Sequence, residues 1–128
     1  MKIGFIGTGN MGGALASAAA KSGEAQVLLA NRTKAKAEAL AGRIGAAVSG
    51  NEMIAKEADH IFLGVKPQMM ADMLTGIAPA LKERGSAPVL VSMAAGVTIA
   101  RIQELAGGDY PVIRIMPNMP AAVGEGVI

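Results

Sequence analysis

Cysteine and tryptophan are absent from this sequence of 128 residues, and its only aromatic side chains are Phe5, Phe62 and Tyr110. Without cysteine there are no disulfides and no thiolate ligands for a metal ion, which suits a reducing compartment such as the cytoplasm. Three scattered aromatics are too few for a surface that stacks nucleic-acid bases. There is also little excess of one charge over the other, because 12 basic and 10 acidic residues give a net charge of +2. We therefore expect no nucleic-acid partner.

Long hydrophobic runs are missing too. No uninterrupted apolar stretch approaches the roughly 18 residues that a membrane helix needs. The apolar N-terminal stretch is broken by glycines and lacks the cleavage site of a signal peptide. What the sequence does contain is 52% hydrophobic residues, most of them small or aliphatic. This composition favours one domain in which helices pack closely on a buried sheet, with no membrane partner.

Apolar runs of strand length alternate along the chain with longer helical stretches. The predicted strands span residues 2–7, 26–30, 46–48, 60–65, 87–93 and 111–116. The predicted helices span residues 9–21, 33–44, 51–58, 67–83 and 98–105. Thr33 is a plausible N-cap and Gly45 a helix stop. The strands are continuously apolar, which is typical of a parallel sheet buried on both faces. Right-handed crossovers then predict an α/β, doubly wound (Rossmann) fold, mostly parallel, with strand order 3-2-1-4-5-6 and helices on both faces.

A glycine motif, G-x-G-x-x-G, links the first predicted strand to the first predicted helix. Its residues are Gly7, Thr8, Gly9, Asn10, Met11 and Gly12. The first glycine permits a tight turn, the second lets a pyrophosphate approach the backbone, and the third lets the helix pack on the strand. The position predicts a dinucleotide whose diphosphate lies at a helix N-terminus. A glycine-rich turn without a ligand is the alternative.

The end of the second strand lacks the acidic residue that such folds use to bind the adenosine ribose. Asn31, Arg32 and Thr33 stand there instead. A carboxylate would repel a 2′-phosphate, whereas Arg32 offers a planar fork of donors to it. We therefore expect NADP(H) to bind in preference to NAD(H). In the alternative, Arg32 joins Lys34 and Lys36 on the solvated face of a surface helix.

Other strand ends give weaker signals. Pro67 forces Lys66 to be extended, so that the Lys66 backbone faces the ligand crevice while its ammonium reaches either phosphate or water. Residues 92–97 end one predicted strand in small residues, and residues 116–120 end another in a rigid loop. Either segment could be an ordinary loop. His60, the only histidine, opens a strand at the wrong end for catalysis and is assigned to structure. No metal site is expected and no catalytic residue is assigned.

Taken together, these stretches resemble the pyrroline-5-carboxylate reductase family over essentially the whole chain. The matching pieces are IGFIGTGNMG, NRT, Asn51, FLGVKP, VSMAAGVT and RIMPNMPAAVGEG. The resemblance implies NADPH-dependent reduction of 1-pyrroline-5-carboxylate to L-proline, the last step of proline biosynthesis. It places the cofactor against a set of residues, some of which the motifs above also indicate. They are Ile6, Gly7, Thr8, Gly9, Asn10, Met11, Gly12, Asn31, Arg32, Thr33, Asn51, Val65, Lys66, Pro67, Ala94, Ala95, Gly96 and Asn118.

The resemblance also has a consequence for domain organisation. Chains of that family are about twice as long, and their second half is a helical domain that forms the dimer and most of the substrate pocket. We therefore expect residues 1–128 to be an NADP-binding Rossmann domain, weak or inactive alone, from a parent that is a homo-oligomer. Two rivals stay open. One is an NADP-dependent reductase of the β-hydroxyacid dehydrogenase or deazaflavin-linked type, against which MAAGVT and MPN argue. The other is a non-catalytic nucleotide-binding module.

Overall fold

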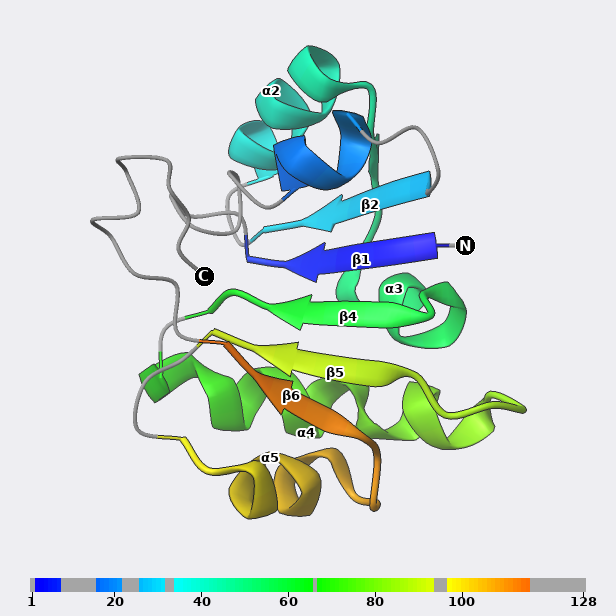
Figure 1. The fold of residues 1–128 in the computed structure, drawn as a ribbon, viewed down its shortest axis with the longest axis vertical. Coiled ribbons are helices and arrows are strands. Elements are labelled where there is room, and N and C mark those ends of the chain that lie inside the picture. Colours follow the sequence, from blue (N-terminus) through cyan, green and yellow to red (C-terminus); the bar gives the residue numbers. More distant parts are fainter. Residues whose placement is uncertain are drawn as a thin grey trace.

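The computed structural model describes residues 2–7, 16–21, 26–31, 34–65, 67–93 and 97–115, and of Lys34 and Pro67 it describes the backbone alone. The strands form one six-stranded sheet in the order β3-β2-β1-β4-β5-β6 (Figure 1). Every neighbouring pair is parallel. The strands are β1 (Lys2–Ile6), β2 (Gln26–Ala30), β3 (Ala47–Val48), β4 (His60–Leu63), β5 (Val89–Ser92) and β6 (Val112–Arg114). The predicted fold class and strand order are confirmed.

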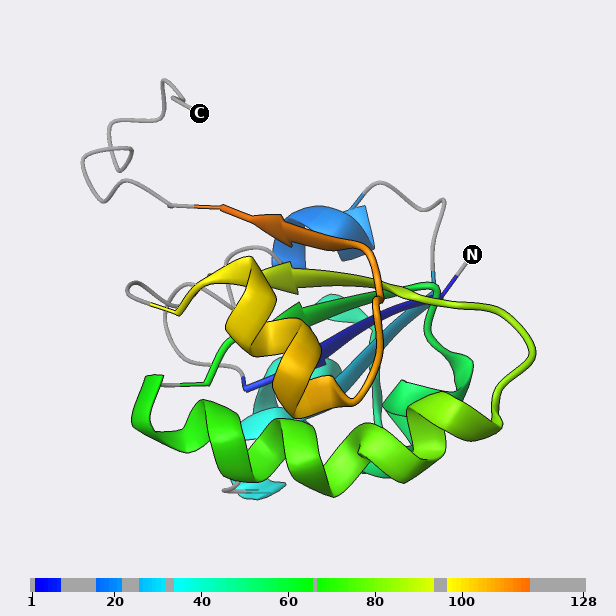
Figure 2. The same ribbon diagram turned by 90° about the horizontal axis from the view of Figure 1, so that it is seen from below.

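Helices connect the strands. They are α2 (Lys34–Ile44), α3 (Asn51–Glu57), α4 (Pro67–Glu83) and α5 (Ile99–Ala106). Residues 16–21 are helical as well. Figure 2 shows α4 and α5 on the same side of β5. Among the described helices, none combines the length and the apolarity needed to span a bilayer.

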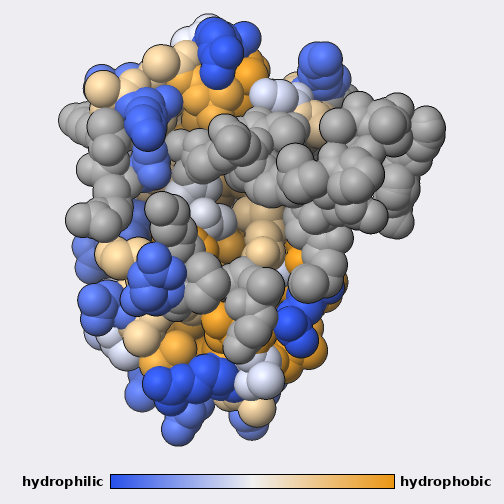
Figure 3. All heavy atoms as spheres, turned by 90° about the vertical axis from the view of Figure 1, so that its left-hand side faces the viewer, coloured by the Kyte–Doolittle hydropathy of each residue, from blue (hydrophilic) through white to orange (hydrophobic). Residues whose placement is uncertain are grey.

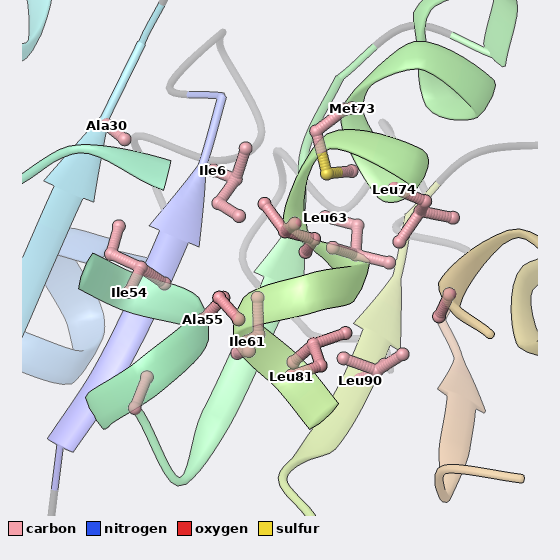
Figure 4. Packing of buried hydrophobic residues seen from close by; sticks show 14 of the residues in the cluster. Ile6, Ala30, Ile54, Ala55, Ile61, Leu63, Met73, Leu74, Leu81 and Leu90 are labelled. Atoms are coloured by element: carbon pink, nitrogen blue, oxygen red, sulfur yellow. The ribbon is translucent and has the colours of Figure 1, made fainter. Parts of the chain in front are cut away.

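The two faces of the sheet carry separate hydrophobic clusters. On one face, side chains of α3, α4 and α5 pack against Ile6, Leu63 and Leu90 (Figure 4). On the other face, α2 and the helical residues 16–21 pack against Phe5 and Leu29. Because both faces are covered, the strands are apolar at successive positions rather than at alternate ones. Helices on both faces were predicted from this pattern.

The only two phenylalanines meet at the centre of the sheet. Phe5 of β1 and Phe62 of β4 stack with ring centroids 4.6 Å apart and an interplanar angle of 19°. They are partners in the parallel register. A stacked aromatic pair adds about 0.5–1.5 kcal/mol beyond the area that the rings bury.

The strands are shorter than the apolar runs that predict them. β4 ends at Leu63 rather than at residue 65, and β5 and β6 each lose residues at both ends. A run of apolar residues indicates that the segment is buried, whereas a strand ends where its backbone hydrogen bonds to the neighbouring strand end. Gly64 and Val65 stay half-buried after β4 has ended. The helix ends are predicted more accurately: Gly45 follows α2 with φ +77°, and Thr98 is the N-cap of α5.

Candidate functional site

The carboxyl ends of the strands lie along one edge of the sheet, which is the side to which the arrowheads point in Figure 1. Backbone hydrogen bonds fix the segments that leave this edge. The N–H of Gly7 donates to the carbonyl oxygen of Ala30 at 2.7 Å, and the N–H of Gly64 donates to that of Ile6 at 2.8 Å. The N–H of Ser49 donates to the carbonyl oxygen of Leu29 at 2.8 Å. In an open parallel sheet, ligands bind beyond this edge.

Two glycines bring the ends of β1 and β4 into direct contact. Gly7 has φ +92°, and a Cβ on it would lie 2.7 Å from the carbonyl carbon of Gly64. A Cβ on Gly64 would lie 2.6 Å from the carbonyl oxygen of Gly7. Only glycine fits at either position. The tight turn expected at Gly7 is present, whereas the sequence analysis assigns no role to Gly64. A glycine directly after a buried strand is the signal that could have revealed it.

Beside this contact, a cleft of about 430 Å³ opens between the ends of β2 and β3. Its volume lies within the range of about 300–1,000 Å³ typical of small-molecule sites. The residues that line it are Ala30, Asn31, Ala37, Val48, Ser49, Gly50 and Asn51. Figure 3 looks onto this edge of the molecule, where weakly polar side chains lie between strongly hydrophilic ones.

The chemistry of the cleft suits a nucleoside. Ala30, Ala37 and Val48 supply apolar walls, and Asn31, Ser49 and Asn51 supply neutral donors and acceptors. None of the described residues that line the cleft is acidic. An apolar slot with a few polar groups at its rim accommodates a flat heteroaromatic ring and a ribose. The absence of a carboxylate among these residues removes the repulsion that a phosphate on that ribose would meet.

The structure places five of the predicted site residues at the carboxyl edge. Asn31 directly follows β2 and Asn51 begins α3, and both line the cleft. Gly7 follows β1, and Val65 follows β4 and packs partly against the core. The side chain of Ile6 is 2% exposed within the core, so it is not available to a ligand. These five residues therefore lie along one edge of the sheet.

The other predicted site residues contribute less. Pro67 begins α4. The rest lie outside the described residues: Thr8, Gly9, Asn10, Met11, Gly12, Arg32, Thr33, Lys66, Ala94, Ala95, Gly96 and Asn118. The other residues that line the cleft were not predicted from the sequence. Ser49 and Gly50 could have been, because they directly follow β3. Ala37 and Val48 carry no signal of their own, because the fold alone brings them to the cleft.

The amino edge of the sheet is a separate structural region. His60 opens β4 there, as predicted, on the opposite edge from the cleft. Next to it, the carboxylate of Asp59 accepts a hydrogen bond of 2.9 Å from the N–H of Lys2. This bond, together with the positive charge of Arg84, lowers the pKa of Asp59 from its usual 3.8, although desolvation acts in the opposite direction. Among the described residues, no cluster of histidine, aspartate or glutamate could hold a metal ion.

Comparison with known proteins places the chain in a class. A model of the family described as NADP oxidoreductase, coenzyme F420-dependent, matches residues 2–96. The chain therefore belongs to this family of oxidoreductases.

Within this class, the resemblance to pyrroline-5-carboxylate reductases is confirmed. The Corynebacterium melassecola pyrroline-5-carboxylate reductase is 38% identical over 98% of this chain and 47% of its own length. The Escherichia coli reductase is 40% identical over 98% of this chain and 47% of its own length. The crystal structure of Plasmodium falciparum pyrroline carboxylate reductase with NADP bound superposes with a TM-score of 0.76 and 30% identity, covering 98% of this chain and 45% of that one. The chain thus spans about half the length of these relatives.

Proposed function

We propose that this chain binds NADP(H) at the carboxyl edge of its sheet and supplies the cofactor-binding half of a pyrroline-5-carboxylate reductase. The observation that carries the proposal is the neutral cleft at the end of β2, in which Asn31 stands where an acidic residue would exclude a 2′-phosphate. The similarity to a relative that binds NADP supports the same assignment.

In this proposal the cleft holds the adenosine half of the cofactor. Asn31 and Asn51 face the ribose from two sides, and Ala37 and Val48 contact the adenine ring. Arg32 and Thr33, which follow Asn31 directly in the sequence, supply donors to the 2′-phosphate. A guanidinium donates two parallel hydrogen bonds to a phosphate, so Arg32 contributes most of the preference for NADP(H) over NAD(H).

The diphosphate and the nicotinamide then extend along the strand ends. The contact between Gly7 and Gly64 leaves main chain rather than side chains at the ends of β1 and β4, so the diphosphate can approach the turn. Further along the edge, the proposal assigns the nicotinamide half to residues beyond β4, β5 and β6. They are Val65, Lys66, Pro67, Ala94, Ala95, Gly96 and Asn118.

The proposed reaction is the reduction of 1-pyrroline-5-carboxylate to L-proline in the cytoplasm. A bound NADPH would supply a hydride to the carbon of the imine, which is protonated on its nitrogen, so that the amine of L-proline and NADP⁺ result. The residues of this chain bind and orient the cofactor, and none is assigned as an acid or base. We propose that the half of the relatives outside the match completes the substrate pocket and forms a homo-oligomer. The chain alone is then weak or inactive as a catalyst.

Binding of the two coenzymes tests the cofactor assignment. NADPH and NADH are titrated against the chain, with the fluorescence of the reduced nicotinamide as the signal, since the sequence contains no tryptophan. Two charge-assisted hydrogen bonds contribute roughly 3–6 kcal/mol before solvent screening, and after screening we expect NADPH to bind about ten- to a hundredfold more tightly. Equal affinity for the two coenzymes would remove the proposed role of the β2 end.

A chimera tests the substrate assignment. Residues 1–128 replace the matched segment of the Escherichia coli relative, and NADPH oxidation is followed with 1-pyrroline-5-carboxylate. Turnover by the chimera, with little or none by the chain alone, is expected. A chimera that binds NADPH yet leaves the imine unchanged would contradict the assignment. Full activity of the chain alone would contradict the proposed division between two halves.

The family description also names coenzyme F420, which keeps a deazaflavin-linked reductase as the second candidate. Oxidised F420 is therefore offered to the chain and to the chimera together with NADPH. Hydride transfer to F420 without reduction of the imine would favour this second reaction. Binding of NADPH with no transfer to either acceptor would favour a non-catalytic nucleotide-binding module.

A further inference from the structure

We infer that Gly4 and Arg84 act as positioning residues, which hold helix α3 in place and thereby set the wall of the cleft formed by residues 49–51. Neither residue lines the cleft, so their effect on a ligand must pass through α3. The inference rests on the proposed function, because it assigns the wall to the adenosine half of the cofactor.

Arg84 holds the C-terminal end of α3. Its Nη1 donates to the carbonyl oxygen of Ala55 at 2.8 Å and to that of Ala58 at 2.7 Å. If the helix continued, the Ala55 carbonyl oxygen would accept a hydrogen bond from the N–H of Asp59. That N–H instead donates to the backbone carbonyl oxygen of Lys2 in β1 at 2.8 Å. The guanidinium therefore satisfies carbonyl groups that the end of the helix leaves open. Its positive charge also lies at the negative end of the helix dipole.

Gly4 sets the distance between α3 and the sheet. A Cβ on Gly4 would overlap the Cγ2 atom of Ile54 and would lie 3.2 Å from the Cβ of Ala58. Ile54 and Ala55 are fully buried against this part of the sheet (Figure 4). The helix is thus held on one side by the backbone of β1 and at its end by Arg84, which follows α4.

The N-terminal end of the same helix forms the cleft. Asn51 is its first residue and Gly50 its N-cap, and both line the cleft together with Ser49. No side chain caps this end of the helix. α3 has seven residues and is therefore only about 10 Å long, so a displacement at its C-terminal end moves Asn51 as part of one rigid body. The two ends of α3 couple Arg84 to the cleft.

The main test compares Arg84→Met with Arg84→Lys. Met keeps the length of the side chain and removes its donors, whereas Lys keeps the charge. Titration with adenosine 2′,5′-bisphosphate reports on the cleft alone, and titration with NADPH reports on the whole site. We expect Arg84→Met to weaken both ligands by the same factor, about three- to tenfold, because the defect is confined to the adenosine half. Arg84→Lys restores part of the loss.

Two control variants separate positioning from general stability. Arg101→Met removes the same charge from an exposed pair with Glu104 and leaves both affinities unchanged. Thr98→Ala removes the N-cap of α5 and lowers the thermal midpoint without affecting either ligand. An Arg84→Met protein that is less stable but binds adenosine 2′,5′-bisphosphate within twofold of the wild type would overturn the inference.

A measurement without ligand keeps the inference separate from the proposed function. Amide hydrogen exchange of residues 49–53 is expected to be faster in Arg84→Met and in Gly4→Ala than in Arg101→Met. Exchange that is unchanged in both would overturn the positioning role, whatever binds in the cleft. If exchange rises while the wild-type chain binds neither nucleotide, the proposed function fails and the hold of Arg84 on α3 stands.

Discussion

Gly7 and Gly64 lie backbone against backbone at the carboxyl ends of β1 and β4. A Cβ on Gly7 would stand 2.7 Å from the carbonyl carbon of Gly64, and a Cβ on Gly64 would stand 2.6 Å from the carbonyl oxygen of Gly7. A real Cβ atom essentially never comes this close to another heavy atom. Each of the two positions therefore needs glycine because the backbone of the other lies against it. Their contact keeps side chains away from the place where the proposed diphosphate approaches the sheet.

Alanine at either glycine is therefore expected to destabilise the fold. The new methyl group overpacks a rigid backbone contact, which costs about 1–3 kcal/mol. Gly7→Ala is the worse of the two, because alanine at φ +92° adds strain of roughly 1–3 kcal/mol. Urea unfolding monitored by circular dichroism measures both changes. NADPH affinity, measured below the unfolding transition, should fall in both variants.

Gly76→Ala is the matched control for these two substitutions. Gly76 lies inside α4, and a Cβ there would meet nothing within 4 Å. Replacing a helical glycine by alanine stabilises by about 0.5–1 kcal/mol. A gain at Gly76 and a loss at Gly7 and Gly64 is the expected pattern, and equal losses at all three positions would contradict the contact described above.

Asn31→Asp is expected to abolish most of the proposed preference for NADPH over NADH. A carboxylate at the end of β2 would repel the 2′-phosphate of NADPH and accept hydrogen bonds from the free ribose of NADH. We expect NADPH to bind at least about tenfold more weakly, equivalent to about 1.4 kcal/mol, while NADH binds as well as before or better. Parallel titrations of the two coenzymes measure the change.

Asn31→Ala separates repulsion from the loss of the amide. It removes the side-chain contacts without adding charge, so its effect on NADPH should be smaller than that of Asn31→Asp and should depend less on salt. Similar losses in the two variants at low ionic strength would mean that charge at this position does not select the coenzyme.

Thr98→Ala is expected to destabilise α5. The Thr98 side chain accepts a hydrogen bond of 3.1 Å from the N–H of Arg101, and loss of such a cap costs about 1 kcal/mol. Thr75→Ala in α4 provides the comparison, because the Thr75 hydroxyl donates to the carbonyl oxygen of Ala71 on the exposed face of that helix. Loss of that bond should be neutral or slightly stabilising. Thermal unfolding of the two variants should move in different directions or by clearly different amounts.

Asp59→Asn is expected to change how stability depends on pH. The pKa of Asp59 is lowered from 3.8 in the folded protein, first by the hydrogen bond from the N–H of Lys2. The ionised carboxylate therefore contributes stability above about pH 3.8, and that contribution is lost as the pH falls through the lower folded pKa. Urea unfolding between pH 7 and pH 2 should show a gap between wild type and variant that narrows with acid. A gap of constant size would contradict the shift.

The order of the elements could be predicted from the sequence because each step depends on nearby residues. Continuous apolar runs indicate buried parallel strands, and Gly45 marks the end of a helix by local chemistry. The position of Asn31 at the cleft follows from the same reasoning, since it comes directly after a predicted strand. The strand ends could not be predicted in this way, because β4 stops where pairing with β1 and β5 stops.

The supporting residues of the site escaped prediction for a related reason. Arg84 lies in a polar turn and looks like a solvated residue in the sequence, and its partners are 29 and 26 positions away. Gly4 looks like an ordinary strand residue until α3 is placed on it. Contacts of this kind depend on how the helices lie on the sheet, which no local pattern records.

The central place of β1 has a consequence for biosynthesis. Its register with β4 joins Ile3 to His60, so β1 gains its second neighbour in the sheet only after about half of these 128 residues have been translated. Until then the N–H and C=O groups along one edge of β1 are unpaired and can form hydrogen bonds with another polypeptide. Non-local pairing of this kind slows folding, and the nascent chain meets its greatest exposure to chaperones, or to misassembly, before residue 63 is made.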